Sequence, residues 1–260
     1  MSDLDRDSQR AKRAMQLKGK VVLVTGASSG IGKATAAAFA HKGAHVLVHY
    51  GKNRAGAEET LREVESVSSG AVLQADLMDR ERIRALFEEI RRTAPAVDVL
   101  VNNAGDARAG AIGDDDTWGY ELDNIFFSAI RVSREFLAMP YAGLRKIVNI
   151  TSLYGNLHGG SAEFLQYSAF KAALASVTAT MNKSTAPGVI LNAVAPGYTE
   201  TPAWAGAPPE IKQALAGTTS IGRFVTADEV AHAVVFVAEN DALVGQVITL
   251  DGGTSLKVLP

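Results

Sequence analysis

From Lys20 onward, short runs of apolar and largely β-branched residues alternate with longer amphipathic stretches. Most of the runs are apolar throughout, which is typical of strands that are covered on both faces. The runs are residues 21–25, 45–50, 71–76, 98–105, 146–152, 189–197 and 246–253. Strands that alternate with helix-length stretches indicate βαβ units. The sequence therefore predicts an α/β fold: a doubly wound, seven-stranded parallel sheet with helices on both faces.

The stretch between the third and fourth runs has the period of a helix. Residues 79–93 place four apolar side chains on one face, which are Ile83, Leu86, Phe87 and Ile90. No linker, repeat or change of composition divides the chain, so we expect a single domain over residues 18–260. Residues 1–17 are rich in charge, and we expect them to form a flexible tail.

Composition excludes several classes of function. The chain has 26 basic and 28 acidic residues, so it has no excess of positive charge for nucleic acid or an anionic membrane. It has no cysteine, which excludes disulfides, thiolate metal sites and cysteine nucleophiles. No apolar run approaches the roughly 20 residues of a membrane span, and the N-terminal residues lack the apolar core of a signal peptide. We expect a cytoplasmic protein.

The first run leads into TGASSGIG at residues 25–32, where a strand must turn sharply into a helix. Glycines at positions 26, 30 and 32 permit the turn and let backbone N–H groups approach a pyrophosphate closely. The following helix then directs its positive N-terminus at that anion. The spacing is a variant of the dinucleotide fingerprint and predicts a dinucleotide cofactor.

The end of the second run indicates which dinucleotide binds. NAD-binding proteins place an acid there for the ribose 2′-hydroxyl, but residues 34–57 contain no acid. Lys52 and Arg54 stand there instead, with His49 nearby, and cations attract a 2′-phosphate. The alternative is that Lys52 and Arg54 are solvated turn residues. The pattern favours NADP(H), and NAD(H) stays possible.

Three further residues suit proton transfer at a substrate oxygen. Ser152 ends the fifth run, at the sheet edge where open α/β sheets bind ligands. Tyr167 and Lys171 are four residues apart and share one face of a helix. The lysine ammonium and an oxidised nicotinamide ring both favour phenolate, so we expect them to lower the tyrosine pKa. Tyr167 would exchange a proton with an oxygen that Ser152 hydrogen-bonds.

In this order, the motifs resemble the short-chain dehydrogenase/reductase family in its single-domain form. The resemblance covers about residues 18–257 and includes TGASSGIG, NNAG at 102–105, Asn124 in LDNIFF, Ser152, Tyr167 with Lys171, and PGYTET at 196–201. It implies a nicotinamide-dependent alcohol/carbonyl oxidoreductase on a Rossmann fold, which acts on a small molecule as a homotetramer or homodimer.

The resemblance also implies a role for each matching residue. Tyr167 is the general acid/base, Ser152 orients the carbonyl, Lys171 binds the nicotinamide ribose, and Asn124 holds a water that relays a proton to Lys171. The implied cofactor contacts, together with those expected from the loops above, are Gly26, Ser28, Ser29, Gly30, Ile31, Gly32, Lys52, Arg54, Asp76, Leu77, Asn102, Ala104, Gly105, Tyr167, Lys171, Pro196, Gly197, Thr199 and Thr201.

The chain departs from the family pattern in two places near the expected site. Ser28 and Ser29 stand where many NADP-linked members carry Arg or Lys. The segment between Ser152 and Tyr167 is a couple of residues longer than usual. Because that segment contributes to the substrate pocket, the resemblance says less about the pocket's shape than about its chemistry.

Substrate contacts are expected from loops at the same edge, and the candidates are Leu153, Asn156, His158 and Trp204. Residues 198–223 form a candidate lid with few charges, so a strongly ionic substrate is not expected. A Pro-Pro pair at 208–209 predicts a short helix within the lid. The acidic run at 114–116 predicts a helix start and first turn, and we expect no metal site.

Several functions remain open. The general prediction is a ketone reductase, and a 3-oxoacyl-(acyl-carrier-protein) reductase is one specific form of it. An acidic carrier protein would require a basic rim, for which Arg131, Arg134, Arg145 and Lys146 are the candidates. A sugar or alcohol dehydrogenase that uses NAD is a second possibility. The third is a non-catalytic dinucleotide-binding sensor or scaffold, which would have no need of Tyr167.

Overall fold

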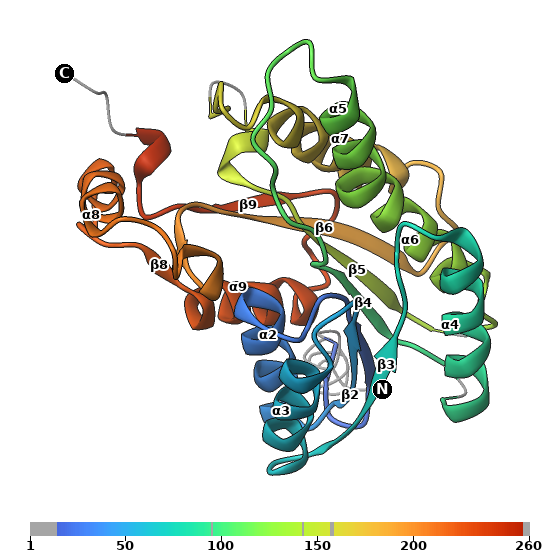
Figure 1. Ribbon diagram of the computed structural model, residues 1–260. Helices are drawn as coiled ribbons and strands as arrows, with labels where there is room; N and C mark the ends of the chain where they lie inside the picture. Colours follow the sequence, from blue (N-terminus) through green and yellow to red (C-terminus); the bar gives the residue numbers. More distant parts are fainter. Residues whose placement is uncertain (1–14, 95, 142, 157–158, 257–260) are drawn as a thin grey trace, which may run out of the picture.

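The computed structural model describes residues 15–94, 96–141, 143–156 and 159–256. Seven parallel strands in these ranges form one twisted sheet in the order β3-β2-β1-β4-β5-β6-β9 (Figure 1). The strands are β1 Val21–Val24, β2 His45–Tyr50, β3 Ser69–Gln74, β4 Val99–Asn102, β5 Arg145–Ile150, β6 Val189–Pro196 and β9 Val247–Leu250. The order reverses at β1 and β4, which confirms the predicted doubly wound sheet.

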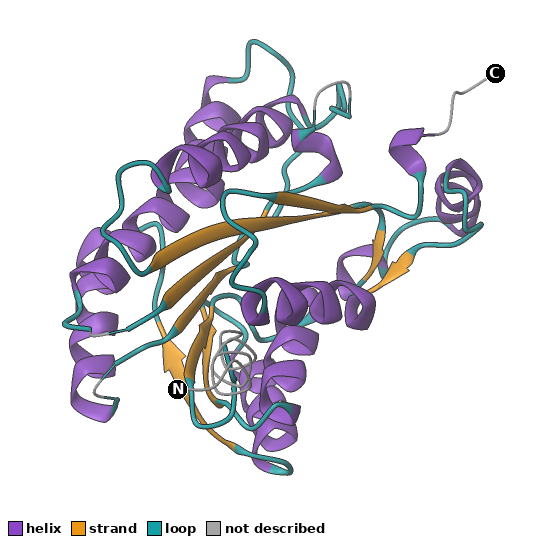
Figure 2. Cartoon of the chain, turned by 180° about the vertical axis from the view of Figure 1, so that it is seen from behind, coloured by secondary structure: helices purple, strands orange, loops and turns teal. Residues whose placement is uncertain are grey.

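Helices cover both faces of the sheet. On one face lie α2, α3 and α9, and on the other lie α4, α5, α6 and α7, as the two opposite views show (Figures 1 and 2). The helices are α2 Gly30–His41, α3 Arg54–Glu65, α4 Arg80–Thr93, α5 Asp115–Glu121, α6 Ser128–Ala138, α7 Leu165–Met181, α8 Pro209–Thr218 and α9 Ala227–Glu239.

The core has one hydrophobic layer on each side of the sheet. Val22 and Val24 of β1 pack in the layer that contains Phe39 of α2. Leu23, which lies between them in the sequence, packs in the opposite layer with Phe87 of α4. Successive side chains of a strand point to opposite faces, so a strand buried on both faces must be apolar at every position. This explains the continuous apolar runs.

The predicted helix at residues 79–93 is confirmed as α4. The Asp79 side chain caps it by accepting hydrogen bonds from the backbone N–H groups of Glu81 and Arg82. All four residues of its predicted face are buried, namely Ile83, Leu86, Phe87 and Ile90.

The acidic run also starts a helix as predicted, because the Asp114 side chain accepts from the backbone N–H of Thr117 at the start of α5. No group of three or more His, Cys, Asp or Glu side chains is placed to hold a metal ion within the described ranges.

The lid segment is tied together at its base by a feature that the sequence does not predict. The short strands β7 (Thr199–Glu200) and β8 (Val225–Thr226) pair in parallel, separately from the main sheet. The predicted Pro-Pro helix is present between them as α8, with Pro209 in its first turn. The two ends of the lid are therefore hydrogen-bonded to each other.

The N-terminal boundary of the packed structure differs from the prediction. Met15 and Leu17 fall within the predicted tail, yet both side chains are buried in the layer beneath α2 and α9. The backbone N–H of Met15 also donates to the carbonyl of Glu239 at the end of α9. Both residues are apolar, and burying them stabilises the end of the chain against the core. Residues 1–14 of the predicted tail lie outside the described residues.

Four strands end two or three residues before the ends of the runs that predicted them. They are β3, which ends at Gln74, β4 at Asn102, β5 at Ile150 and β9 at Leu250. The remaining residues of these runs leave the carboxyl edge of the sheet as loops. At this edge, where the strand order reverses, α/β sheets bind ligands. None of the described helices is long and apolar enough to cross a membrane.

Candidate active site

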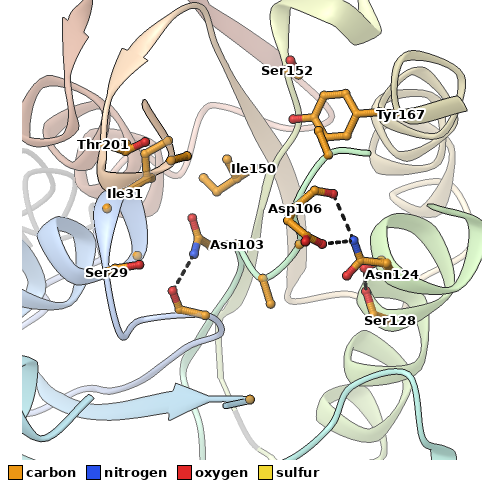
Figure 3. Close-up of a pocket in the computed structure, with 18 of the residues that line it drawn as sticks. Ser29, Ile31, Asn103, Asp106, Asn124, Ser128, Ile150, Ser152, Tyr167 and Thr201 are labelled. Atoms are coloured by element: carbon orange, nitrogen blue, oxygen red, sulfur yellow. Dashed lines mark hydrogen bonds between the residues drawn. The ribbon is translucent and has the colours of Figure 1, made fainter. Parts of the chain in front are cut away.

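A cavity of about 1090 Å³ opens at the carboxyl ends of β1, β4, β5 and β6 (Figure 3). The loops that follow these strands line it, together with the start of α2 and one face of α7. The glycine loop lies at one side of the cavity and Tyr167 at the other. The residues predicted to bind a dinucleotide and those predicted to transfer a proton therefore share one chamber.

The glycine loop presents unobstructed backbone to the cavity. Gly26 and Gly30 have φ angles of +62° and +54°, which residues with side chains rarely adopt. A Cβ at Gly32 would lie 2.3 Å from the Gly26 carbonyl oxygen. Ser29 precedes α2 without a side-chain cap, and the first turn of the helix has no acid. Uncapped N–H groups at a helix N-terminus fit the pyrophosphate of a dinucleotide.

Polar side chains hold this loop in place. The Asn103 side-chain amide donates to the carbonyls of Thr25 and Gly26 at 2.9 and 3.1 Å. The Gly26 N–H donates to Nδ1 of His49, whose Nε2 lies 3.1 Å from the Ala75 carbonyl. Burial lowers the pKa of His49 to about 4. The imidazole is therefore neutral and supports the loop, so it does not supply a cation for a 2′-phosphate.

The two cations after β2 have different surroundings. Lys52 lines the cavity, as predicted. Arg54 is absent from the lining, because it starts α3 and pairs its Nε with Oε1 of Glu58 at 2.8 Å. The Asn53 side chain caps this helix and so directs the chain away from the cavity after Lys52. The prediction that Arg54 contacts the cofactor is not supported.

Ser152, Tyr167 and Lys171 meet at the opposite side of the cavity. Tyr167 and Lys171 project from α7, and the Ser152 side chain lies beside Tyr167 (Figure 3), close enough to favour its phenolate and lower its pKa. The Lys171 Nζ donates to the Ile150 carbonyl at 2.7 Å and lies 5.4 Å from the centre of the Tyr167 ring. The lysine is therefore fixed behind the tyrosine by the end of β5.

Asn124 lies in a π-helical turn, Leu122–Phe127, between α5 and α6. Its side-chain amide donates to Oδ1 of Asp106 at 2.8 Å and to the Asp106 carbonyl at 3.0 Å (Figure 3). Its own carbonyl accepts from the Ser128 hydroxyl. Such π-turns are rare and often occur at functional sites. Here the turn connects Asn124 to the loop that follows β4.

The profile of a protein family described as enoyl-(acyl carrier protein) reductase matches residues 26–255, which include the glycine loop and every catalytic candidate. The chain belongs to the short-chain dehydrogenase/reductase family. It is an oxidoreductase that depends on NAD(P) and interconverts a carbonyl group and an alcohol.

Individual members of the family are similar over almost the whole chain. A cis-4-hydroxycyclohexanecarboxylate dehydrogenase of Sinomonas cyclohexanicum is 35% identical over 242 residues, which are 90% of this chain and 96% of that protein. The 3-oxoacyl-(acyl-carrier-protein) reductase FabG of Thermotoga maritima is 32% identical, over 92% and 99% of the two chains. The crystal structure of the angucycline C-6 ketoreductase LanV with bound NADP matches with a TM-score of 0.86 at 27% identity, over 94% of this chain and 99% of that one.

Burial shifts the pKa of both Tyr167 and Lys171. It raises the pKa of Tyr167 from 10.0 to about 12, against the opposing hydrogen bond from Ser152. It lowers the pKa of Lys171 from 10.5 to about 8. The expected lowering of the tyrosine pKa by lysine is therefore not found in the protein alone, because desolvation of the phenolate dominates. At neutral pH the phenol is protonated and the amine carries a charge.

Glu121 is a buried acid behind this pair that sequence reasoning missed. Its side chain is 0% exposed, and Oε1 accepts from the backbone N–H of Arg108 at 2.6 Å. Burial raises the pKa of Glu121, and its negative charge in turn raises the pKa of Tyr167 and of Lys171. The one available signal was its position, about one helical turn before Asn124.

Most predicted site residues line the cavity. Those that do are Gly26, Ser28, Ser29, Gly30, Ile31, Gly32, Lys52, Asp76, Leu77, Ala104, Gly105, Asn124, Ser152, Leu153, Tyr167, Lys171, Pro196, Gly197, Thr199, Thr201 and Trp204. Asn156 is outside the lining and donates to the Thr249 hydroxyl instead. His158 lies outside the described residues.

Asn102 is also outside the cavity lining, although it was predicted to contact the cofactor. Its side chain is buried and donates to Ser133 and to Asn149 at 2.9 and 2.8 Å. The next residue, Asn103, lines the cavity. Adjacent side chains at the end of a strand point in opposite directions, so only one of the two asparagines can reach the cofactor side.

The basic rim proposed for an acidic carrier protein does not form. Arg145 and Lys146 begin β5, at the sheet edge opposite the cavity, and both are buried. Arg131 is buried as well and pairs with Asp123. Of the four candidates, only Arg134 is exposed, and it pairs with the neighbouring Glu135.

Proposed function

We propose that the protein is a cytoplasmic, NADPH-dependent reductase of small-molecule ketones, with Ser152, Tyr167, Lys171 and Asn124 as its catalytic set. The observation that carries the proposal is the Ser152–Tyr167 pair, which faces the same cavity as the uncapped N-terminus of α2. Reduction of a ketone needs a proton donor, and a phenol with a pKa of about 12 is protonated at neutral pH.

The cavity fits a nicotinamide dinucleotide. Backbone N–H groups from Ser28 to Gly32 would hold the pyrophosphate, because the N-terminus of α2 has no side-chain cap and lines the cavity. Asp76 and Leu77 line the end of the cavity near β3, where they would meet the adenine, and Thr199 and Thr201 would meet the nicotinamide end. When bound, the cofactor supplies the hydride.

The protein's own residues supply position and a proton. Ser152 hydrogen-bonds the substrate oxygen and orients the carbonyl, and Tyr167 donates its proton as negative charge develops on that oxygen. The Lys171 ammonium, held by the Ile150 carbonyl, stabilises the phenolate that remains. Asn124 would hold a water that returns the proton through Lys171.

Lys52 supports NADPH as the preferred cofactor. It lines the cavity after β2, where the sequence has no acid to repel a 2′-phosphate. LanV, which was crystallised with NADP, adds support from a structural relative. Oxidation of an alcohol with NAD is the second candidate, since the relative from Sinomonas cyclohexanicum is a dehydrogenase of a hydroxycyclohexane acid. Reduction of a carrier-bound acyl chain is less favoured, because the basic rim is absent.

A homodimer or homotetramer is the expected assembly, on the basis of the family resemblance alone. Light scattering on the purified protein measures it directly, and a monomeric mass would contradict it.

Cofactor binding and turnover test the catalytic proposal together. Titration of nicotinamide fluorescence should show that NADPH binds about tenfold more tightly than NADH, a difference of about 1.4 kcal/mol. In Tyr167→Phe, kcat should fall about thousandfold, while the dissociation constant of NADPH stays within about twofold. Tight NADPH binding without any turnover in the unmodified protein would favour a dinucleotide sensor, and tighter NADH binding would favour the dehydrogenase.

A further inference from the structure

Four aromatic side chains surround the part of the cavity next to Ser152 and Tyr167. We call Tyr154, Phe164, Tyr198 and Trp204 the aromatic corner. All four line the cavity and are half-buried. They come from separate segments: the loop after β5, the start of α7 and the lid. Half-exposed rings that gather around a reactive group offer a large apolar contact area to a ligand.

The rings form two walls that meet at a right angle. Tyr154 and Phe164 are nearly parallel, with their ring centres 6.2 Å apart and their planes at 27°. Tyr198 is likewise nearly parallel to the buried Phe224 behind it, at 5.7 Å and 27°. The planes of Tyr154 and Tyr198 cross at 86°, with 6.2 Å between the ring centres. The two walls are therefore flat, rigid and perpendicular.

The reactive phenol and the lid belong to the same aromatic network. The Tyr167 ring is perpendicular to that of Tyr154, at 6.4 Å between centres. Trp204 is perpendicular to Tyr198 at 6.2 Å and packs against Phe224 at 5.0 Å. Each ring is thus held by at least one other ring. A ligand that binds there meets preorganised walls and immobilises few protein side chains.

The aromatic corner itself carries no charged side chain, and the charged residues that line the cavity within the described ranges lie outside it. Lys52 and Asp76 lie at the adenosine end, and the Lys171 Nζ is engaged by the Ile150 carbonyl. The Asp106 carboxylate accepts hydrogen bonds from Tyr120 and Asn124.

The corner itself offers only neutral hydroxyls. The hydroxyl groups of Tyr154 and Tyr198 lie 3.4 Å apart, and burial raises the pKa of Tyr154 further above its ordinary value. An ionic group on the substrate would lose its hydration here without gaining a partner.

We propose that the aromatic corner selects neutral ketones whose carbonyl carbon belongs to a ring, in preference to open-chain ketones and acyl chains of the same size. The inference deepens the proposed function and rests on it. A rigid ring fills the angle between two flat walls without losing internal rotations. An open chain must fix several rotatable bonds to make the same contacts, and each fixed bond costs conformational entropy. The two substrates bury similar apolar area, so the difference in ordering decides between them.

Two ketones of ten carbons, 1-decalone and 2-decanone, test the preference with NADPH as the reductant. The cyclic ketone should have the larger kcat/KM by at least about tenfold. In Tyr198→Leu and Trp204→Leu, this ratio should fall toward one, mainly through loss of activity on 1-decalone. Phe236→Leu is the matched control, because Phe236 is an exposed ring on α9, away from the cavity, and it should leave the ratio unchanged. Retained NADPH binding shows that each variant is folded.

A binding measurement separates this inference from the proposed function. The chain has two tryptophans, so Trp118→Phe leaves Trp204 as the single fluorescent reporter in the corner. Quenching of Trp204 should show at least about tenfold tighter binding of 1-decalone than of 2-decanone in the presence of NADP⁺.

Equal or tighter binding of 2-decanone would overturn the inference and leave the reductase assignment intact. Tighter binding of 1-decalone without reduction of either ketone would support the corner's selectivity and contradict the proposed reaction.

Discussion

The two ends of the cavity are built in opposite ways. At the glycine loop, the cavity surface is largely backbone, held by hydrogen bonds from polar side chains such as Asn103 and His49. At the aromatic corner, the surface consists of large side chains carried on loops and on the lid. The first construction recognises a group common to all dinucleotides and tolerates almost no added atom. The second sets the shape of the substrate pocket, and its side chains are carried on loops outside the sheet. Cofactor recognition and substrate selection are therefore separable in this protein.

The glycine loop should show the largest effect of a single added methyl group. In Gly32→Ala the new Cβ would lie 2.3 Å from the Gly26 carbonyl oxygen and 2.5 Å from the Asn103 amide nitrogen. Such overpacking costs about 1–3 kcal/mol of stability unless the loop moves to relieve it. A displaced loop no longer presents its N–H groups to the pyrophosphate, so NADPH binding should weaken by at least about tenfold. Fluorescence titration measures the change. Gly119→Ala in α5 is the control, since its Cβ meets nothing within 4 Å. Equal binding by both variants would show that the loop adapts.

The pH dependence of ketone reduction should report the protonation of Lys171, which lies between the glycine loop and the aromatic corner. Its pKa of about 8 means that the ammonium is lost as the pH rises through 8, while Tyr167, with a pKa of about 12, stays protonated. Because the charged lysine stabilises the phenolate, kcat/KM should change little between pH 6 and 7.5 and be about tenfold lower by pH 9.

A variant of Glu121 sharpens this test. Its negative charge raises the pKa of Lys171, so Glu121→Gln should move the decline in kcat/KM to lower pH. Lys171→Met should lack the decline and have a low rate at every pH. An unshifted profile in Glu121→Gln would mean that the buried acid does not act on the lysine.

The smallest expected effect distinguishes two neighbouring cations. Lys52→Ala should weaken NADPH binding about fivefold, the size expected for one exposed charge pair of about 1 kcal/mol, and should leave NADH binding unchanged. Arg54→Ala should change neither, because Arg54 is paired with Glu58 outside the cavity. Parallel titrations of the two variants with both cofactors provide the comparison. A larger loss in Arg54→Ala would show that α3 rearranges when the cofactor binds.

The sequence predicts the cofactor end well because its signals are local. A strand, three glycines and a helix follow one another between Val21 and His41, and the backbone of this segment forms the expected pyrophosphate site. The errors there are local as well. Asn53 is a typical helix-capping residue, so the start of α3 at Arg54 could have been predicted. Which of Asn102 and Asn103 reaches the cavity depends on the face of the sheet to which the last side chain of β4 points, and the sequence does not give that.

The substrate end could not be predicted in the same way. The aromatic corner assembles residues 154, 164, 198 and 204, and no spacing in the sequence indicates that their rings meet. Glu121 acts on Tyr167 only through the packing of α5 against α7, and the raised pKa of the tyrosine depends on a burial that no motif encodes. These properties are tertiary, because they depend on how distant segments of the chain pack together.

The pairing of β7 with β8 has a consequence for how such a protein changes over time. The lid between them carries Trp204 and α8, and its two ends are hydrogen-bonded side by side. Because its two ends are held together, this segment can change in length without moving the residues on either side of it. Doubling its length costs only about 0.6 kcal/mol in closure entropy, and the frame that carries Tyr167 does not move. The segment between β7 and β8 can therefore vary in length and composition while the catalytic residues stay in place, so that the same reaction is directed to different substrates.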